Sequence, residues 1–123
     1  MDDRAGLGRT GEKHAERFLR REKKYLIVTR NYHSQFGEID LVAVDGKTIV
    51  FVEVKTRTTA DHADPQDAVN AGKRERIARG AEFFLRQTRS EDRPCRFDIL
   101  AIIKNEHGEL EVEHLLDAFT PDR

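Results

Sequence analysis

Residues suited to hydrolytic chemistry stand inside the most strand-like segment of the chain. The apolar stretch FGEIDLVAVDGKTIVFVEVKTR is interrupted by Glu38, Asp40, Glu53 and Lys55, where a half-buried sheet would favour Val or Thr. Three carboxylates beside one ammonium leave surplus negative charge, which suits a hard divalent cation with oxygen ligands. The segment therefore predicts a Mg²⁺ or Mn²⁺ site, in which Lys55 could orient water or stabilise charge on a phosphoryl group.

A β-hairpin would bring these side chains together. Asp45-Gly46 is a strong two-residue turn signal, and it predicts that Val44 pairs with Lys47. In that register the acids at positions 38 and 40 share a sheet face with Glu53 and Lys55. A slip of one residue would separate Asp40 from Glu53, so the metal site depends on the register.

Asp40 and Glu53 are the expected metal ligands, and the Val54 carbonyl could add a third oxygen. The alternative is a ladder of ordinary salt bridges on a solvated sheet face, because a Glu-x-Lys triplet alone is common in strands. Glu12 borders the apolar stripe of the first predicted helix. Taken alone, the residue pattern favours an acid placed near the helix start by the macrodipole.

The remaining pattern predicts one domain over residues 1–123. Apolar spacing indicates a helix over residues 10–23 with Thr10 as N-cap, and a second helix that begins at Asp64-Pro65 and reaches about Gln87. Strands are expected over residues 25–32, 38–44, 47–56, 95–103 and 110–116. Arg96 and Asp98 are expected to form a structural ion pair at a strand start.

This order predicts an α/β fold with an αβββαβ core and a mixed central sheet flanked by helices. The long helix between the third and fourth strands suits a parallel crossover, since parallel neighbours need a long connection.

Composition bounds the class of protein. Hydrophobic and charged residues each make up 37% of the chain, and the apolar residues are grouped, which argues against global disorder. One cysteine excludes an intrachain disulfide, and the histidines lack zinc spacing. The beginning of the chain has no apolar signal-peptide core, and no run is long enough to span a bilayer, so a cytoplasmic protein without a membrane partner is expected.

Charge is unevenly distributed although the net charge is only −1. Residues 105–123 carry −5, so residues 1–104 carry +4, with basic segments over 17–24 and 73–89. Such asymmetry permits a phosphate-binding face, and Arg57, Lys73 and Arg74 are the candidate contacts with nucleic acid. Solvated helix faces are the alternative, and Lys73 could simply extend to solvent. The sequence shows no aromatic cluster typical of a base-stacking platform.

Two motifs together resemble a known family. The segments Gly37-Glu38-Ile39-Asp40-Leu41 and Val50-Phe51-Val52-Glu53-Val54-Lys55-Thr56-Arg57 closely resemble the bacterial YraN-like family of predicted nucleases, and the likeness extends over most of the chain. That family is similar in pattern to the restriction-endonuclease-like superfamily, with its PD-(D/E)xK signature, and to archaeal Holliday-junction resolvases. The combination is specific, whereas either half alone is not.

The resemblance implies a restriction-endonuclease-like fold and metal-dependent hydrolysis of DNA phosphodiesters. Asp40 matches the signature aspartate, Glu53 and Lys55 match the (D/E)xK half, and Glu12 matches a first-helix glutamate that joins the metal site. Ile39 stands where the signature has proline, which carries no ligand. Residues 61–63 depart from an aromatic-Gly pair expected in the family, so the loop on the substrate side differs from the pattern.

These observations lead to the hypothesis of a Mg²⁺- or Mn²⁺-dependent endonuclease acting on DNA, in particular branched or structured DNA. A symmetric homodimer would suit an enzyme that cuts two strands of a junction. One alternative is a non-catalytic nucleic-acid-binding or adaptor protein that keeps the fold. Another is a structural domain whose charged face meets a protein partner.

Overall fold

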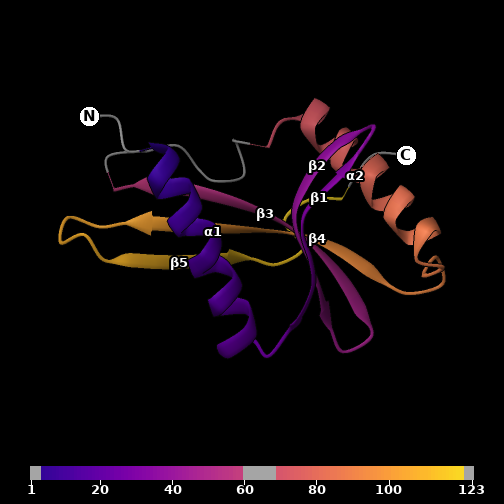
Figure 1. Cartoon of the computed structure of the whole chain (residues 1–123), viewed down its shortest axis with the longest axis horizontal. Coiled ribbons are helices and arrows are strands. Elements are labelled where there is room, and N and C mark those ends of the chain that lie inside the picture. Colours follow the sequence, from indigo (N-terminus) through magenta and orange to yellow (C-terminus); the bar gives the residue numbers. More distant parts are fainter. Residues whose placement is uncertain (1–3, 60–68, 121–123) are drawn as a thin grey trace.

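A mixed five-stranded sheet with two helices forms the fold (Figure 1). The computed structural model describes residues 4–59 and 69–120. In chain order the elements are α1 (Arg4–Arg21), β1 (Leu26–Ser34), β2 (Gly37–Asp45), β3 (Thr48–Thr58), α2 (Ala71–Gln87), β4 (Cys95–Lys104) and β5 (Leu110–Leu115). The sheet order is β1-β2-β3-β4-β5, and only β3 and β4 pair in parallel. The predicted mixed α/β architecture is confirmed.

The central strand β3 is covered on both faces. Ile49 and Phe51 belong to one apolar cluster, which includes the buried side of α2, while Val50 and Val52 belong to a second cluster, which includes the buried side of α1. Alternation along a strand sends neighbouring side chains to opposite faces, so a nearly continuous apolar run fits a strand between two helical layers. Figure 1 shows α1 crossing β3, β4 and β5, and α2 lying beside the β1–β2 hairpin.

Helix α1 begins at Arg4, six residues before the predicted N-cap Thr10, which lies inside the helix. Gly11, within the helix, has a packing reason. A Cβ at Gly11 would lie 2.1 Å from Cγ2 of Thr56, so only glycine lets the helix approach β3 this closely. Ala15 and Leu19 are fully buried and fasten the same helix face to the sheet.

Helix α2 begins at Ala71, and its N-cap is Asn70, whose side chain accepts a hydrogen bond from the Lys73 amide. The prediction of a helix starting at Asp64-Pro65 and passing through Val69 was wrong in its described part, because Val69 and Asn70 are not helical. Asn is favoured at the N-cap because its side-chain oxygen accepts a hydrogen bond from a first-turn amide that has no partner within the helix. Positions 61–65 themselves lie outside the described residues.

The β2–β3 hairpin turns one residue later than expected. Asp45 pairs with Thr48, and Val44 with Ile49 rather than with Lys47, so Gly46 and Lys47 form the turn. Gly46 has φ +61°, the left-handed conformation that glycine adopts without a steric penalty. The register therefore shifts by two residues, which is the smallest shift that keeps every side chain on its expected face.

A buried polar network joins β4 to β5 and to the start of β1. Asp98 is fully buried and accepts hydrogen bonds from Arg96 Nε (3.1 Å), His114 Nε2 (2.8 Å) and the Asp117 amide (2.9 Å). Arg96 also donates to Asp45 and to Tyr25. Burial alone would raise the pKa of Asp98, but these donors together hold it below its ordinary value. The predicted structural ion pair is confirmed.

Within residues 4–59 and 69–120, no helix combines the length and the apolar character needed to cross a bilayer.

Candidate metal centre

Strand β2 loses its regular alternation at Asp40. Ile39 and Val42 both belong to the α2-side cluster, whereas Leu41 belongs to the α1-side cluster. The opposing strand is irregular at the same level, because Asn31 has φ +48° between the pairs Arg30↔Leu41 and Tyr32↔Ile39. Asn tolerates this left-handed conformation better than most residues. Both strands are thus irregular at the level of Asp40.

The side chain of Asp40 points between β2 and β3. Its Oδ2 accepts a hydrogen bond from the Val54 amide at 2.8 Å, just beyond the last regular β2–β3 pair, Leu41↔Val52. The carboxylate thus lies beside the peptide that joins Glu53 to Val54, and the prediction that Asp40 projects from the same face as Glu53 stays a prediction. A side-chain oxygen here replaces a backbone acceptor where the two strands separate.

Burial and, next in size, the charge of the neighbouring Glu53 raise the pKa of Asp40 to about 7, against the opposing hydrogen bond from Val54. Glu12, on α1, contributes in the same direction. A carboxyl with a pKa near neutrality is costly to ionise, so an added cation would be favourable at this position.

Glu53 is buried, and one of its carboxylate oxygens forms ion pairs with two lysines. Lys73 Nζ lies 2.6 Å and Lys55 Nζ 3.3 Å from its Oε1. The side chain of Glu53 is 7% exposed, against 22% for Lys55 and 31% for Lys73, so both ammonium groups reach in from the surface. The structure thus adds Lys73, from α2, to the site that the sequence predicted from the hairpin alone.

The pKa values of the two lysines are shifted in opposite directions. Burial lowers the pKa of Lys55, and the adjacent Lys73 lowers it further. For Lys73, burial is the largest single influence and acts downward, but the hydrogen bonds to Glu53 and Lys55 and the charges of Glu53 and Asp40 together raise the pKa. Lys55 is therefore the more readily deprotonated of the pair.

Glu12 is partly buried on the first half of α1, near the same cluster. Burial raises its pKa, and so do the charges of Glu38 and Glu53. Glu38 is exposed and pairs across the hairpin with His33. Acids from α1, β2 and β3 thus influence one another electrostatically. The family resemblance had implied that Glu12 belongs to the same site as Glu53.

The described residues do not form a complete metal-binding group. Within 4–59 and 69–120, no three His, Cys, Asp or Glu side chains stand close enough together to hold an ion. The carboxylate of Asp40 bonds to the Val54 amide, and that of Glu53 pairs with lysines. The members of the expected ligand set, Asp40, Glu53, Val54 and Glu12, nevertheless interact within one region. Their function as metal ligands stays a prediction.

The other two candidates for nucleic-acid contacts have structural partners. Arg74 donates to the Val69 carbonyl at 2.7 Å, and its guanidinium lies 5.3 Å from the ring centre of Phe119. Arg57 is partly buried near the end of β3, where it pairs in register with Ile103 of β4. The Arg74 side chain therefore has a structural role at the start of α2.

Sequence reasoning missed contacts between residues that are distant in the chain. Phe36, after β1, and Phe83, on α2, form an edge-to-face pair with ring centres 6.4 Å apart. The absence of an aromatic cluster typical of a base-stacking platform was inferred from spacing along the chain, which carries no information on contacts between distant segments. The local sequence around each phenylalanine gave no signal of this pair.

Fold and site together define a class: a mixed α/β domain with a buried acid–lysine cluster where two antiparallel strands separate. Comparison with known proteins identifies the family. The chain belongs to the uncharacterised protein family UPF0102, whose model matches residues 11–102. This confirms the family resemblance noted in the sequence, and the matched range contains every residue of the cluster.

Relatives in this family match along nearly their whole length. A UPF0102 protein of Geotalea uraniireducens is 44% identical over 117 residues, which cover 95% of this chain and 91% of the relative. One from Prosthecochloris aestuarii is 45% identical over 118 residues, covering 92% of each chain. One from Symbiobacterium thermophilum is 42% identical over 113 residues, covering 92% and 95%.

Proposed function

We propose that this protein is a metal-dependent endonuclease that hydrolyses DNA phosphodiester bonds, with a restriction-endonuclease-like fold. The observation that carries the proposal is Asp40, whose pKa is raised to about 7 by burial and by Glu53 at the point where two strands separate. Carboxyl groups with strongly shifted pKa values cluster at functional sites. The sequence resemblance supplies the reaction class.

The residues fit a hard divalent cation by their chemistry. Asp40 and Glu53 offer carboxylate oxygens, with Glu12 and the Val54 carbonyl as further donors, and Mg²⁺ needs only one or two carboxylates because it keeps several waters. When bound, the ion supplies positive charge to the phosphodiester and makes an attacking water more acidic.

The two lysines have different roles in this proposal. Lys55, with its lowered pKa, accepts a proton from the attacking water or orients it. Lys73 stays protonated and holds Glu53 in place in the absence of substrate. A phosphate that enters the site would compete with Glu53 for the Lys73 ammonium, which links substrate binding to release of the carboxylate.

A second candidate function is a non-catalytic nucleic-acid-binding or adaptor protein. One observation favours it: Lys55 and Lys73 already neutralise Glu53, so this carboxylate does not need a metal to be stable. In that case Lys73 and the basic surface of α2 would bind phosphates without hydrolysis.

Cleavage assays separate the two functions. The purified protein is incubated with duplex, single-stranded, flapped and four-way DNA in Mg²⁺, Mn²⁺ or EDTA, beside the variants Asp40→Asn and Glu53→Gln. We expect cleavage only with metal and a loss of about a hundredfold or more in both variants, since metal-borne charge stabilisation is worth several kcal/mol. Binding without cleavage, unchanged in both variants, would support the adaptor.

Glu75→Gln is the matched control, because it removes an exposed carboxylate from the same helix that carries Lys73. Glu75 pairs with Arg79 at 2.8 Å and is outside the acidic cluster. Its activity should equal that of the parent protein. Thermal unfolding with and without Mn²⁺ provides a second measurement, since a ligand that binds only the folded state raises the melting temperature. Equal Mn²⁺-induced shifts in the parent and in Asp40→Asn would exclude Asp40 as a ligand.

A further inference from the structure

A partly exposed aromatic pair lies where the β1–β2 hairpin meets α2. Phe83 is 41% exposed, and its ring meets that of Phe36 edge to face at 6.4 Å. The hairpin packs on the helix at Gly80, where even a Cβ would make ordinary van der Waals contact with Ile39 at 3.4 Å and Ser34 at 3.6 Å. The pair is therefore held by a packed hairpin–helix contact, and part of its apolar surface faces solvent.

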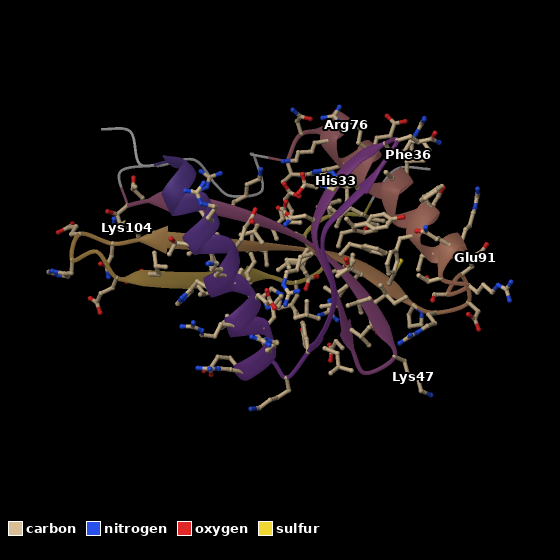
Figure 2. The ribbon with its side chains drawn as sticks, viewed as in Figure 1. His33, Phe36, Lys47, Arg76, Glu91 and Lys104 are labelled. Atoms are coloured by element: carbon tan, nitrogen blue, oxygen red, sulfur yellow. The ribbon has the colours of Figure 1, made fainter. Side chains whose placement is uncertain are left out.

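Positive charge leads from the acidic cluster to this pair along α2. Lys73 contacts Glu53, and Arg76 follows one helical turn later, exposed. Phe83 comes seven residues after Arg76, which places both on the same helix face. The separation of ten residues between Lys73 and Phe83 corresponds to about 15 Å along the helix. Figure 2 shows Arg76, His33 and Phe36 at the same end of the molecule.

We infer that Phe83 and Phe36 form a stacking platform for an unpaired base of the DNA substrate, a few nucleotides from the phosphate at the acidic cluster. The inference deepens the proposed nuclease function and rests on it for the position of that phosphate. The distance of about 15 Å equals roughly four nucleotide steps of a DNA strand, and fewer when the strand is extended. Arg76 lies between the two points and can neutralise an intervening phosphate.

An unpaired base is the partner that fits this surface. Bases inside a duplex are stacked on their neighbours, so their faces are not accessible to a protein ring, whereas an unpaired base offers a free face. Phe83 has no polar atom that could read base edges, so the contact would recognise an unpaired nucleotide of any sequence. The substrate class is therefore DNA with unpaired nucleotides next to the cleavage position, such as a flap, a fork or a gap.

Fluorescence of 2-aminopurine tests the platform without relying on cleavage. DNA with a single-stranded arm carries the fluorescent base at one of about the first five unpaired positions, and binding is measured in EDTA beside a full duplex of equal length. We expect the parent protein to prefer the armed DNA and to quench the fluorescence at one or two positions. Phe83→Leu should lose the quenching and bind armed DNA about fivefold to a hundredfold more weakly, with duplex binding unchanged.

Two further variants separate stacking from packing. Phe83→Tyr keeps an aromatic ring and should keep both the quenching and the preference. Leu26→Ala removes a 71% exposed apolar side chain from the opposite end of β1 and should change neither. Urea unfolding of each variant reports any loss of hairpin–helix packing, which alone would lower stability and leave the fluorescence unchanged.

The outcomes distinguish this inference from the proposed function. Equal binding of armed and duplex DNA by the parent protein, or quenching that persists in Phe83→Leu, overturns the platform even if cleavage is observed. Quenching that depends on Phe83 without any cleavage in Mn²⁺ supports the platform and refutes the nuclease. Binding to neither DNA refutes both.

Discussion

Asp40 has an environment that disfavours its charged form. It lies between β2 and β3, accepts one amide hydrogen bond, and faces the acidic groups of Glu53 and Glu12. Its pKa of about 7 means that, without metal, the folded protein keeps a proton there that the unfolded chain has released above about pH 4. Proton uptake therefore accompanies folding between these two pH values.

This predicts a stability change with pH. Because the folded state binds more protons between about pH 4 and pH 7, the free energy of unfolding should fall as pH rises through this window, by on the order of 2–4 kcal/mol. Asp40→Asn removes the titration, so its stability should lack that decrease. Urea unfolding in EDTA at a series of pH values measures the difference between the two proteins. Parallel curves would show that the pKa of Asp40 is not raised.

At the scale of elements, the approach of α1 to β3 depends on one missing side chain. Gly11→Ala would place a methyl group 2.1 Å from Thr56 Cγ2, and overpacking of this kind costs about 1–3 kcal/mol. Removing that methyl with Thr56→Ser should rescue the alanine, because alanine in a helix interior is favoured over glycine by about 0.5–1 kcal/mol. Thermal unfolding of the single and double variants measures the coupling.

Gly8→Ala is the control for this prediction. Gly8 lies in the same helix with nothing within 4 Å of its would-be Cβ, so alanine there should be neutral or slightly stabilising. Equal losses at both glycines would mean that helix propensity and not contact with Thr56 decides the effect.

The buried network around Asp98 fastens β4 to β5. Asp98→Asn leaves Arg96, His114 and the Asp117 amide with too few acceptors, so we expect a loss of about 3 kcal/mol or more in urea unfolding. Asp45→Asn removes an exposed partner of the same arginine and should cost less than about 1 kcal/mol. Because the pKa of Asp98 is lowered, its stabilisation should be present above the ordinary carboxyl range near pH 4 and lost as pH falls further. Similar losses for both variants would contradict a special role for the buried carboxylate.

At the scale of the whole molecule, charge is separated between two ends. In Figure 2 Arg76 and Phe36 lie at one end, and Lys104 lies at the other, next to the β4–β5 turn that carries the exposed acids Glu106 and Glu109. A DNA strand should therefore bind along α2 and avoid the β4–β5 turn, since phosphate binding depends on local positive charge.

Salt dependence tests this orientation. Arg76→Ala should lower the slope of log K against log salt by about 0.7–0.9, the value of one released counterion. Lys104→Ala removes the same charge from the far end and should leave the slope unchanged. Fluorescence anisotropy with labelled DNA from low to moderate salt provides both slopes. A larger effect at Lys104 would place the DNA elsewhere.

The amino-acid sequence by itself determined the order of the elements and the face of most side chains. Alternating and continuous apolar runs predicted all five strands, and the spacing of Ala15 and Leu19 predicted the buried side of α1. These features are local, because strand and helix periodicity follow from the chain's own geometry. The predicted β2–β3 register differed from the observed one by two residues. The side chains still face the expected side of the sheet, because only a shift by an odd number of residues moves them to the other side.

The tertiary structure decided what surrounds the predicted side chains. Lys73 reaches Glu53 from α2, Asp40 turns into the gap between strands, and Phe83 meets Phe36, all through contacts between segments distant in the chain. Periodicity describes one element at a time and carries no information on how two elements approach each other. That approach depends on packing: Gly11 lets α1 approach β3, and Asn31 adopts a left-handed backbone conformation in the hairpin opposite Asp40.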